Sequence, residues 1–386
     1  MAATEIIEER FKPIFEPIQI NKLKISNRLV LGPMAVTACT AEGYPSDQTI
    51  AFFKARAKGG VGLIIVGGSI ATPRGFNEAP FKPLLRFDVD DYVPKHKRLS
   101  DAIHAMDVPI IIELSGGFGR LGIPPKGVSK ISASPKELTI TEDNFPNGFI
   151  IPGGVTLSAP EQATLAEVKE VENETIKGGI RAFRAGFDGA EIGANMSYFI
   201  SSFVAPRNNW RKDEYGGPIE NRARILVNII KGIRQGTRPD FVIGLRITAE
   251  DGLPDGLTPQ DYADVAKLAE AAGADYISLA YGVYETMSMG VGTKDGGMAH
   301  DGSSKTFKDT LSIPVMIQGI HDPERIAQAI AGGQGDLAML ARPLLADPNY
   351  PNKVKTGRQN EIVVCDRDHL CMRRMIFGMP VRCCMN

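Results

Sequence analysis

Short apolar segments recur along the chain, and each of them ends in small or polar residues. They lie at residues 28–34, 61–68, 108–117, 189–194, 241–247, 275–282, 313–319 and 337–342. Continuous apolar runs of this length are typical of strands that are buried on both faces, as parallel strands are. The pattern therefore predicts eight parallel β-strands.

The stretches between these strands are amphipathic and carry helix signals. Thr258-Pro259 and Asp322-Pro323 each place an N-cap residue before a proline at the first helical position. Several stretches end in glycine, which tolerates the left-handed conformation at a helix C-terminus. Eight β/α units without a second periodic block predict one α/β domain over residues 1–386, a (β/α)8 TIM barrel.

An open doubly wound sheet is the alternative to a barrel. Such a sheet would need a phosphate loop of the G-x-G-x-x-G type after its first strand. The sequence that follows the first predicted strand, "LGPMAVTAC", does not have this form. The barrel is therefore the favoured architecture.

Two segments fall outside the repeat. Residues 118–158, rich in proline, glycine and lysine, follow the third strand and are too long for an ordinary loop. Because the loops after the strands build the active site of a barrel, we expect this insertion to lie over it and to shape substrate access. Residues 350–386 form a C-terminal tail that carries four of the five cysteines.

Charge and hydropathy exclude several classes of function. The 44 basic and 45 acidic residues are spread along the chain and give a net charge of −1, so neither nucleic acid nor a membrane surface is indicated as a partner. The first ten residues lack the apolar core of a signal peptide, and no window predicts a membrane helix. We expect a cytoplasmic protein that acts on small molecules, and the sequence gives no indication of its oligomeric state.

Residues at the carboxyl ends of the strands are the candidates for the active site of such a barrel. They are Pro33, Met34, Ala35, Gly67, Gly68, Glu113, Gly193, Met196, Tyr198, Arg246, Tyr281, Tyr284, Gly319, Ala341 and Arg342. Two arginines and several glycines indicate an anionic ligand across the mouth, with a phosphate at strands seven and eight. The alternative is that both arginines only pair with acids at the rim, but their position in apolar strands favours a functional role.

Four segments carry a resemblance to a known family. They are "IFEPIQINKLKISNRLVLGPM", "FVAPRNNWRKDEYGGPIENRARIL", "VIGLRITAEDG" and "LAMLARPLLADPNYPNKV". Together they resemble the old yellow enzyme family of FMN-dependent barrels, in particular its 2,4-dienoyl-CoA reductase and trimethylamine dehydrogenase branch. The resemblance covers residues 14 to about 385, and it gives residues 213–222 a structural role in the loop and helix after strand four.

The resemblance implies a noncovalent FMN on the barrel mouth and NAD(P)H as the electron donor. Arg246 would face the N1/O2 edge of the flavin ring, and Glu113 stands where a glutamine usually contacts the pyrimidine. The phosphate would be held by Gly319, Ala341 and Arg342. The ring would be lined by Pro33, Met34, Ala35 and Gly67, with Ala35 in the place of a threonine or cysteine that tunes the flavin.

The family reaction that this implies is the reduction of an activated C=C bond. Flavin N5 delivers hydride to the β-carbon, and a tyrosine protonates the α-carbon. Tyr198 falls at the position of that tyrosine. A phenol suits the task because it is neutral at pH 7 and needs only to be placed correctly.

The chain departs from the family where the substrate carbonyl is usually held. Relatives carry a histidine and, three residues later, an asparagine or a second histidine, whereas this chain has Gly193 and Met196. Loss of one such donor typically costs on the order of 3–4 kcal/mol of transition-state stabilisation. Asn195 lies between the two positions, but alternation along an extended segment would turn it to the other face.

Other residues are candidates for the missing donors. Tyr281 and Tyr284 follow strand six, which borders the ligand in this family, and are therefore expected to contact the substrate together with Gly193 and Met196. His300 and His321 follow strands six and seven, and for each a solvent-exposed loop position is the favoured interpretation.

The cysteines of the tail nearly match the pattern C-x2-C-x3-C-x11-C, which holds a [4Fe–4S] cluster in the dienoyl-CoA reductase branch. Cys371 and Cys383 keep the last spacing, but Val364 and Arg367 occupy the first two positions, and Cys365 is one residue out of register. Four thiolates are normally needed, so we expect neither an iron–sulfur cluster nor another metal.

Three functions remain after these comparisons. The first is an FMN-dependent ene-reductase for an unusual substrate, with NAD(P)H as donor and Tyr198 as acid. The second is an FMN-dependent desaturase or a redox-neutral isomerase that uses the same tyrosine. The third is a non-redox barrel that has lost catalysis, and the presence of Arg246, Arg342 and Tyr198 argues against it.

Overall fold

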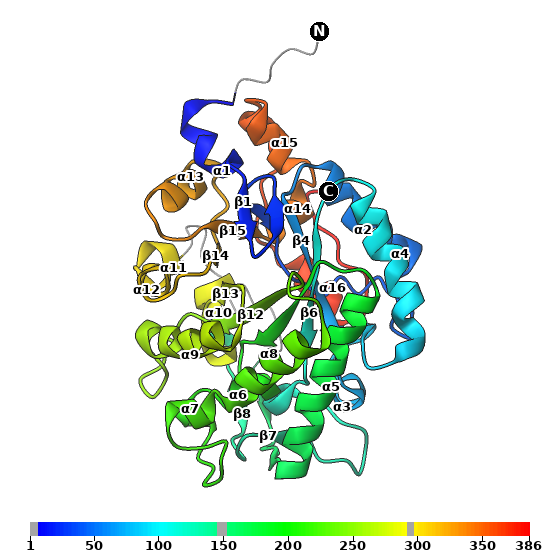
Figure 1. Ribbon diagram of the computed structural model, residues 1–386, viewed down its shortest axis with the longest axis vertical. Helices are drawn as coiled ribbons and strands as arrows, with labels where there is room; N and C mark the ends of the chain where they lie inside the picture. The colour runs from blue at the N-terminus through cyan, green and yellow to red at the C-terminus, as the bar shows by residue number, and fades with distance from the viewer. Residues whose placement is uncertain (1–6, 145–152, 292–296) are drawn as a thin grey trace.

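A closed barrel of eight parallel strands forms the centre of the computed structural model, which describes residues 7–144, 153–291 and 297–386 (Figure 1). Residues 145–152 of the expected insertion lie outside those ranges. The strands follow one another around the barrel in the order β3 (Leu29–Leu31), β4 (Leu63–Ile70), β6 (Ile110–Ser115), β11 (Gly189–Ala194), β12 (Val242–Thr248), β13 (Tyr276–Ala280), β14 (Val315–Gln318) and β15 (Leu337–Leu340). Because β15 pairs with β3, the sheet has no open edge, and the predicted barrel is confirmed.

Helices surround the barrel, as the amphipathic stretches predict (Figure 1). The longer ones are α2 (Asp47–Lys58), α4 (Val93–His104), α5 (Leu165–Arg184), α8 (Arg224–Gly236), α9 (Pro259–Ala272), α12 (Ser303–Thr310) and α13 (Pro323–Ala331). The side chains of Thr258 and Asp322 cap α9 and α13 as expected, and Gly273 ends α9 in the left-handed conformation at φ 109°. Within the described ranges, no helix combines the length and apolar character that crossing a membrane requires.

Shorter helices lie between these elements and after the last strand. They are α1 (Lys12–Phe15), α3 (Pro73–Asn77), α6 (Phe199–Ser202), α7 (Ile219–Arg222), α10 (Met287–Val291), α11 (Gly297–His300), α14 (Arg342–Ala346), α15 (Tyr350–Lys355) and α16 (Leu370–Ile376). The two-residue strand β5 (Leu85–Arg86) extends the sheet beside β4.

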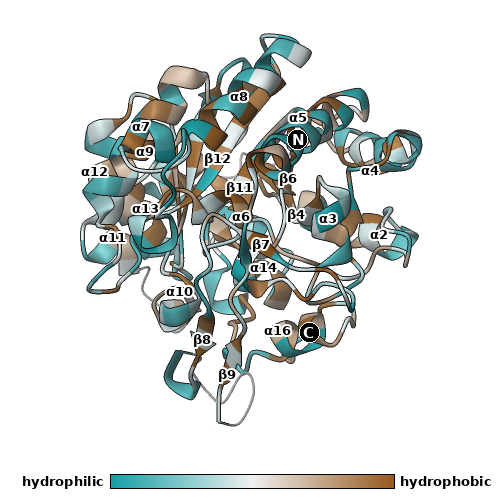
Figure 2. Cartoon of the chain, turned by 90° about the horizontal axis from the view of Figure 1, so that it is seen from below, coloured by the Kyte–Doolittle hydropathy of each residue, from teal (hydrophilic) through white to brown (hydrophobic). Residues whose placement is uncertain are grey.

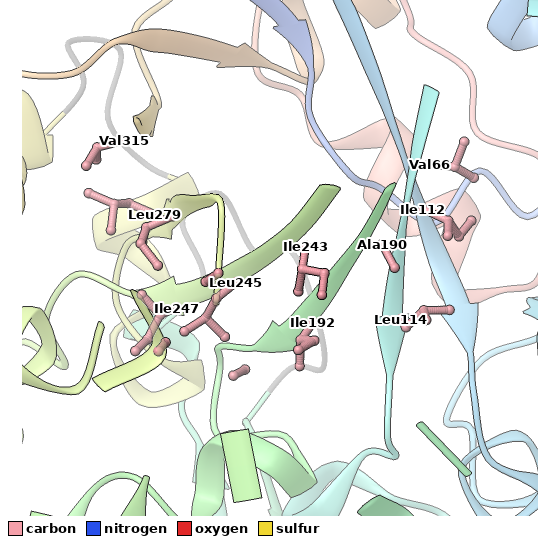
Figure 3. Packing of buried hydrophobic residues seen from close by; sticks show 14 of the residues in the cluster. Val66, Ile112, Leu114, Ala190, Ile192, Ile243, Leu245, Ile247, Leu279 and Val315 are labelled. Carbon is pink, nitrogen blue, oxygen red and sulfur yellow. The ribbon is translucent and has the colours of Figure 1, made fainter. Parts of the chain in front are cut away.

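Alternation along the barrel strands sorts the side chains into an outer and an inner cluster. Figure 3 shows part of the outer cluster, which packs with residues of the surrounding helices and includes Val66, Ile112, Leu114, Ala190, Ile192, Ile243 and Leu245. The inner cluster contains Val30, Leu63, Ile65, Ile111, Val242, Tyr276, Met316 and Leu337. A hairpin of β1 (Ile18–Ile20) and β2 (Leu23–Ile25) packs against the inner cluster. The part of the barrel interior near the amino ends of the strands is therefore filled mainly by apolar side chains.

The insertion and the tail contact each other. The insertion contains β7 (Ile131–Ser132), β8 (Leu138–Ile140) and β9 (Val155–Leu157), with β8 and β9 paired as antiparallel strands. The short strand β10 (Glu161–Gln162), which follows the insertion, pairs with β7. Leu138 and Ile140 pack with Met287 of α10 and with Met372 of α16, so both segments lie on one side of the molecule (Figure 2). Met196 and Tyr284 belong to the same cluster, which places it beside the ends of β11 and β13.

Candidate active site

A cavity of about 300 Å³ lies at the carboxyl ends of the barrel strands. It is lined by most of the residues that the sequence assigns to the cofactor, namely Pro33, Met34, Ala35, Arg246, Gly319, Ala341 and Arg342. Met196 and Tyr281 line it from the side assigned to the substrate. Residues from six strand ends are thus brought together around one space.

Arg246 stands on β12 and is 8% exposed. Its Nη2 donates to Gln318 Oε1 at 2.8 Å, and its Nε lies 3.6 Å from Glu113 Oε1. Arg246 therefore does pair with an acid, but the pair lies inside the barrel mouth and not at an outer rim. The guanidinium also borders the cavity, where it can stabilise negative charge on a ligand.

Two carboxyl groups lie beneath this arginine. Glu113 on β6 and Glu191 on β11 are register partners, and Glu191 is fully buried. Burial raises the pKa of Glu113 to about 7, with Arg246 opposing the rise and Glu191 adding to it. Burial likewise raises the pKa of Glu191, whose Oε2 accepts from Ser278 Oγ at 2.7 Å. Glu113 can therefore be protonated at neutral pH and donate a hydrogen bond.

The end of β11 departs from the extended conformation expected from the sequence. The strand stops at Ala194, and Met196 and Ser197 both have left-handed backbones, with φ of 58° and 59°. Two consecutive residues of this kind are uncommon without glycine, and such backbone strain clusters at functional sites. Asn195 lines the cavity, and the expectation that it faces away is wrong, because a residue two positions after the inward-facing Gly193 returns to the inner face.

Gly193 is buried on the inner face of β11. A Cβ atom there would lie 3.5 Å from Glu113 Oε1, which is an ordinary contact, and 3.3 Å from the carbonyl oxygen of Leu114, which is tighter than usual. A larger residue at this position would therefore require the backbone of β6 to shift by a few tenths of an ångström. Glycine avoids this contact and leaves the space above Glu113 open.

Tyr198 and Tyr284 form a pair beside the cavity. Their hydroxyl oxygens are 2.7 Å apart, and the rings meet edge to face at a centroid distance of 5.8 Å. Burial raises the pKa of Tyr198 to about 12, although the bond to Tyr284 works in the other direction. Burial also raises the pKa of Tyr284, and the neighbouring Tyr198 raises it further. Both phenols are thus protonated at neutral pH, as a proton donor must be.

The other expected donors are placed differently. Tyr281 lines the cavity, but its hydroxyl donates to Asp301. His321 also lines the cavity, contrary to the solvent-exposed position favoured for it. His300 is exposed on α11, as expected. Of these three residues, only Tyr281 and His321 can contact a ligand in the mouth.

Glu285, next to Tyr284, is the centre of an ion-pair network. Its carboxylate accepts two hydrogen bonds from Arg120, at 2.9 and 3.3 Å, and one from Arg207 at 3.2 Å. Burial by itself would raise the pKa of Glu285, but the two arginines outweigh it and lower that pKa. Since Arg120 belongs to the insertion, this network connects the insertion to the loop that carries Tyr284.

The ends of β14 and β15 supply the residues expected at the phosphate. Gly319 has a φ of 94°, which favours glycine, and Ala341 precedes Arg342 at the start of α14. Burial lowers the pKa of Arg342, and the nearby thiols of Cys365 and Cys371 oppose that effect. An arginine with a lowered pKa is still charged at neutral pH and suited to an anion.

Gly67 on β4 lies behind the cavity wall. A Cβ atom at this position would come within 2.4 Å of the backbone nitrogen of Met34 and 2.8 Å of Pro33 Cβ. The glycine therefore lets β4 approach the segment that the sequence assigns to the flavin ring. Its effect on a ligand is through the position of that segment.

The C-terminal tail contributes to the cavity, which the sequence did not reveal. Cys371, Met372, Met375 and Val381 line it, and the tail is fastened by a hydrogen bond from Val381 N to the carbonyl of Val36 at 3.0 Å. Cys365, Cys371 and Cys383 share a hydrophobic cluster under α14. Cys384 is exposed and lies 3.1 Å from Asp366 Oδ1. Burial raises the pKa of Cys371 to about 11, so that this group is a thiol at neutral pH.

The residues around the mouth fit the FMN that the resemblance implies. Two guanidinium groups, Arg246 and Arg342, border one cavity, and guanidinium is a strong donor to phosphate and to an anionic ring edge. A volume of about 300 Å³ is within the range of small-ligand sites. The donor set and the space are thus compatible with this cofactor.

Several lining residues escaped the sequence analysis. Gln318 is a polar residue at the end of an apolar strand, a signal that could have identified it. Met287, Met372 and Met375 come from a loop helix and from the tail, and methionine at these positions has no recognisable pattern. Only the folded chain brings them to the mouth.

The family model of the NADH:flavin oxidoreductase / NADH oxidase family matches residues 13–361. The chain is 31% identical over 385 residues to the NADH oxidase of Thermoanaerobacter brockii, which covers 97% of this chain and 56% of that protein. It is also 31% identical over 402 residues to the cinnamate reductase of Clostridium sporogenes, covering 98% of this chain and 58% of the reductase. The chain thus spans somewhat more than half the length of these relatives.

Among solved structures, a 2-naphthoyl-CoA reductase in complex with 2-naphthoyl-CoA is similar in fold, with a TM-score of 0.87 and 24% identity. The likeness covers 97% of this chain and 57% of the reductase. At this level of identity the likeness indicates a shared barrel architecture. The chemistry of such a barrel depends on the residues of its own site.

Proposed function

Because the chain belongs to the NADH:flavin oxidoreductase / NADH oxidase family, we propose that it is an FMN-dependent oxidoreductase that reduces an activated C=C bond of a small, largely apolar molecule, with NAD(P)H as the electron donor. The observation that carries the proposal is the barrel mouth, where Arg246 and Arg342 border one cavity and the Tyr198–Tyr284 pair lies beside it. The names of two relatives, cinnamate reductase and 2-naphthoyl-CoA reductase, support this type of substrate.

FMN, when bound, would supply the two-electron chemistry by accepting hydride from NAD(P)H and passing it to the β-carbon of the substrate. Arg246 would stabilise negative charge at the pyrimidine edge of the ring, beside Glu113. The phosphate would be held by Gly319, Ala341 and Arg342. The ring would be lined by Pro33, Met34 and Ala35, with Gly67 supporting that segment from behind.

Tyr198 would deliver the proton to the α-carbon from its hydroxyl. The raised pKa of this phenol keeps the proton in place until the carbon becomes basic. Tyr284 lies within hydrogen-bonding distance and can return a proton to the Tyr198 oxygen after the transfer. The Glu285 network would fix Tyr284 in this position, since it holds the adjacent residue through Arg120 and Arg207.

The substrate side of the mouth would select an apolar molecule. Met196 and Met287 line the cavity from the ends of β11 and β13, and the tail adds Met372. Methionine side chains adapt to irregular apolar surfaces. Gly193 would leave room for the substrate, and the ring of Tyr281 would form part of the wall.

Asn195 would be the amide donor closest to the missing carbonyl-binding pair. Its backbone position is set by the turn at Met196 and Ser197, and it lines the cavity. One neutral hydrogen bond contributes about 1 kcal/mol, less than a charged or paired donor. The substrate would therefore be held mostly by apolar contacts. The carbonyl oxygen of a simple enone would receive few hydrogen bonds.

The insertion at 118–158 and the tail at 350–386 would restrict access to the mouth. Both contribute to the cluster that contains Met196, Met287 and Met372. The tail would do so without an iron–sulfur cluster. Such a cluster normally needs four thiolates, whereas only Cys365, Cys371 and Cys383 lie together and the thiol of Cys384 contacts Asp366 instead. Iron and sulfide analysis of the anaerobically purified protein tests this point.

Anaerobic reduction experiments test the proposed function. The purified protein should show a flavin absorption band, NAD(P)H should bleach it, and an apolar cinnamate-like or enoyl substrate should restore it. A colourless protein that does not bind added FMN would contradict the proposal. Bleaching by a saturated substrate alone would indicate the desaturase instead, and double-bond migration without NAD(P)H the isomerase.

A further inference from the structure

Two acidic side chains face the inside of the barrel from neighbouring strands. Glu113 and Glu191 are register partners on β6 and β11. Their chain neighbours Ile112, Leu114 and Ile192 belong to the outer cluster (Figure 3). Because side chains alternate along a strand, both carboxyl groups point inward, at the spacing of adjacent strands.

One cation faces this pair among the described residues. Arg246 of β12 approaches Glu113 to 3.6 Å and acts on Glu191 as well. The other titratable groups that influence Glu113 and Glu191 are the phenols of Tyr276 on β13 and Tyr198 after β11, both of which are neutral. Two possible negative charges are therefore opposed by one positive charge.

Few donors surround Glu191. Its Oε2 accepts from Ser278, and the phenol of Tyr276 lies close enough to oppose the rise that burial causes in the pKa of this carboxyl. Oε1 is buried and makes no hydrogen bond of normal geometry in the part of the chain that the structure describes. A buried, ionised carboxylate with a bare oxygen is costly, and a proton on that oxygen removes the cost.

We propose that Glu113 and Glu191 share one proton beneath the barrel mouth, and that they take up a second proton when negative charge arrives beside Arg246. The second half of this statement rests on the proposed function, because the charge would arrive when bound FMN is reduced. The first half concerns the protein alone.

The proton count follows from electrostatics. Two carboxylates in one site cannot both ionise easily, so one of them keeps its proton well above the usual range. With one shared proton, the pair and Arg246 have no net charge. Since burial brings the pKa of Glu113 to about 7, the second proton is poised near neutrality.

The redox balance is then complete. FMN, when bound, would take up two electrons and one proton as hydride from NAD(P)H and would then carry one additional negative charge. A proton from solvent would move onto the carboxyl pair, and Arg246 would be left to offset the charge of the ligand. In total, two electrons and two protons are taken up, whereas a glutamine at position 113 would limit the uptake to one proton.

Infrared spectroscopy of the flavin-free protein tests the shared proton. The wild type should show a protonated carboxyl band at pH 8.5 that grows as the pH falls through 7, and Glu113→Gln should abolish that growth. Glu285→Gln, which alters a carboxyl whose pKa is lowered by Arg120 and Arg207, serves as the control and should preserve it. Identical pH responses of wild type and Glu113→Gln would overturn the proposal.

The midpoint potential of the FMN-loaded protein tests the second proton. Its slope against pH between 7 and 9 should be twice as steep in the wild type as in Glu113→Gln, and equal slopes would overturn this half. If Glu113→Gln does not fold, Glu191→Gln replaces it in both experiments. A protein that binds no FMN would refute the proposed function, while the infrared result would still decide the shared proton.

Discussion

The two sides of the barrel mouth are built in different ways. On the cofactor side, the ends of β3, β12, β14 and β15 bring Met34, Arg246, Gly319 and Arg342 to the cavity. On the substrate side, the loops after β11 and β13 meet the insertion and the tail. Strand ends are positioned by the register of the sheet, whereas loop residues are positioned by contacts between segments that are distant in sequence.

This difference has a functional meaning. The cofactor side keeps the residue types that an anionic, planar ligand requires. The substrate side combines two left-handed residues, a tyrosine pair and methionine walls, and it has Gly193 and Met196 where the family resemblance leads us to expect carbonyl-binding donors. Because loops can change without altering the barrel, one fold can retain its cofactor and accept a different substrate.

Substitution of Tyr198 by phenylalanine should have the largest effect and should affect the substrate side alone. Loss of a positioned general acid is expected to lower the rate of substrate reduction about 10²–10⁴-fold. FMN affinity and flavin reduction by NAD(P)H should be unchanged, and stopped-flow measurement of the two half-reactions separates these effects. Tyr44→Phe, far along the chain in a ring contact with Tyr92, is the control. An unchanged substrate half-reaction would contradict the role of Tyr198.

Substitution of Arg246 by methionine should disturb the cofactor side and the barrel interior together. Removing one partner of a buried ion pair typically costs about 3–5 kcal/mol. FMN affinity should also fall by more than tenfold, as measured by fluorescence titration. In the Glu113→Gln background the loss of stability should be smaller, because the Glu113 carboxylate, which lies 3.6 Å from Arg246, is no longer there to lose its cation. Equal losses in both backgrounds would refute the pairing.

The stability of the flavin-free protein should depend on pH through Glu113. Its folded pKa is raised to about 7, so between about pH 4.5 and 7 the folded state retains a proton that the unfolded state has released. Stability should therefore fall as the pH rises through this window, by on the order of 3 kcal/mol, and level off above it. Urea unfolding at pH 5 and pH 8 should show a weaker dependence for Glu113→Gln. The same dependence in both proteins would exclude this carboxyl as its source.

Substitution of Glu285 by glutamine should weaken the connection between the insertion and Tyr284. Two arginines would lose their charged acceptor, which is expected to cost about 1–3 kcal/mol of stability. Turnover should fall on the order of tenfold because Tyr284 loses its fixed position, while FMN binding is retained. Asp255→Asn is the matched control, since Asp255 contacts Arg207 but is 61% exposed and such pairs contribute little. Equal effects of both variants would argue against a positioning role for Glu285.

Substitution of Asn195 by alanine should have the smallest effect. The loss of one neutral hydrogen bond, about 1 kcal/mol, predicts a rise in KM of about fivefold. The rate of flavin reduction by NAD(P)H should not change, and steady-state kinetics with a carbonyl-bearing substrate provide the measurement. A weakened affinity for FMN instead would place Asn195 on the cofactor side.

The sequence predicted the barrel and its strands because alternation, apolar runs and capping residues are local properties. Thr258 and Asp322 cap their helices as their spacing indicates. The expectation for Asn195 failed because residues two positions apart share one face of a strand, so that Asn195 lies on the same inner face as Gly193. The left-handed turn at Met196 and Ser197 was not predicted, because it contains no glycine.

The order of strands, the residue types at their ends and the departures at Gly193 and Met196 were determined by the sequence alone. The strands of a parallel barrel all end on the same side, so residues at their carboxyl ends, such as Arg246 and Arg342, come to border one cavity. Only the tertiary structure decided that Tyr198 pairs with Tyr284 and that the tail reaches the cavity. Such contacts depend on how distant segments pack, and no short stretch of sequence contains that information.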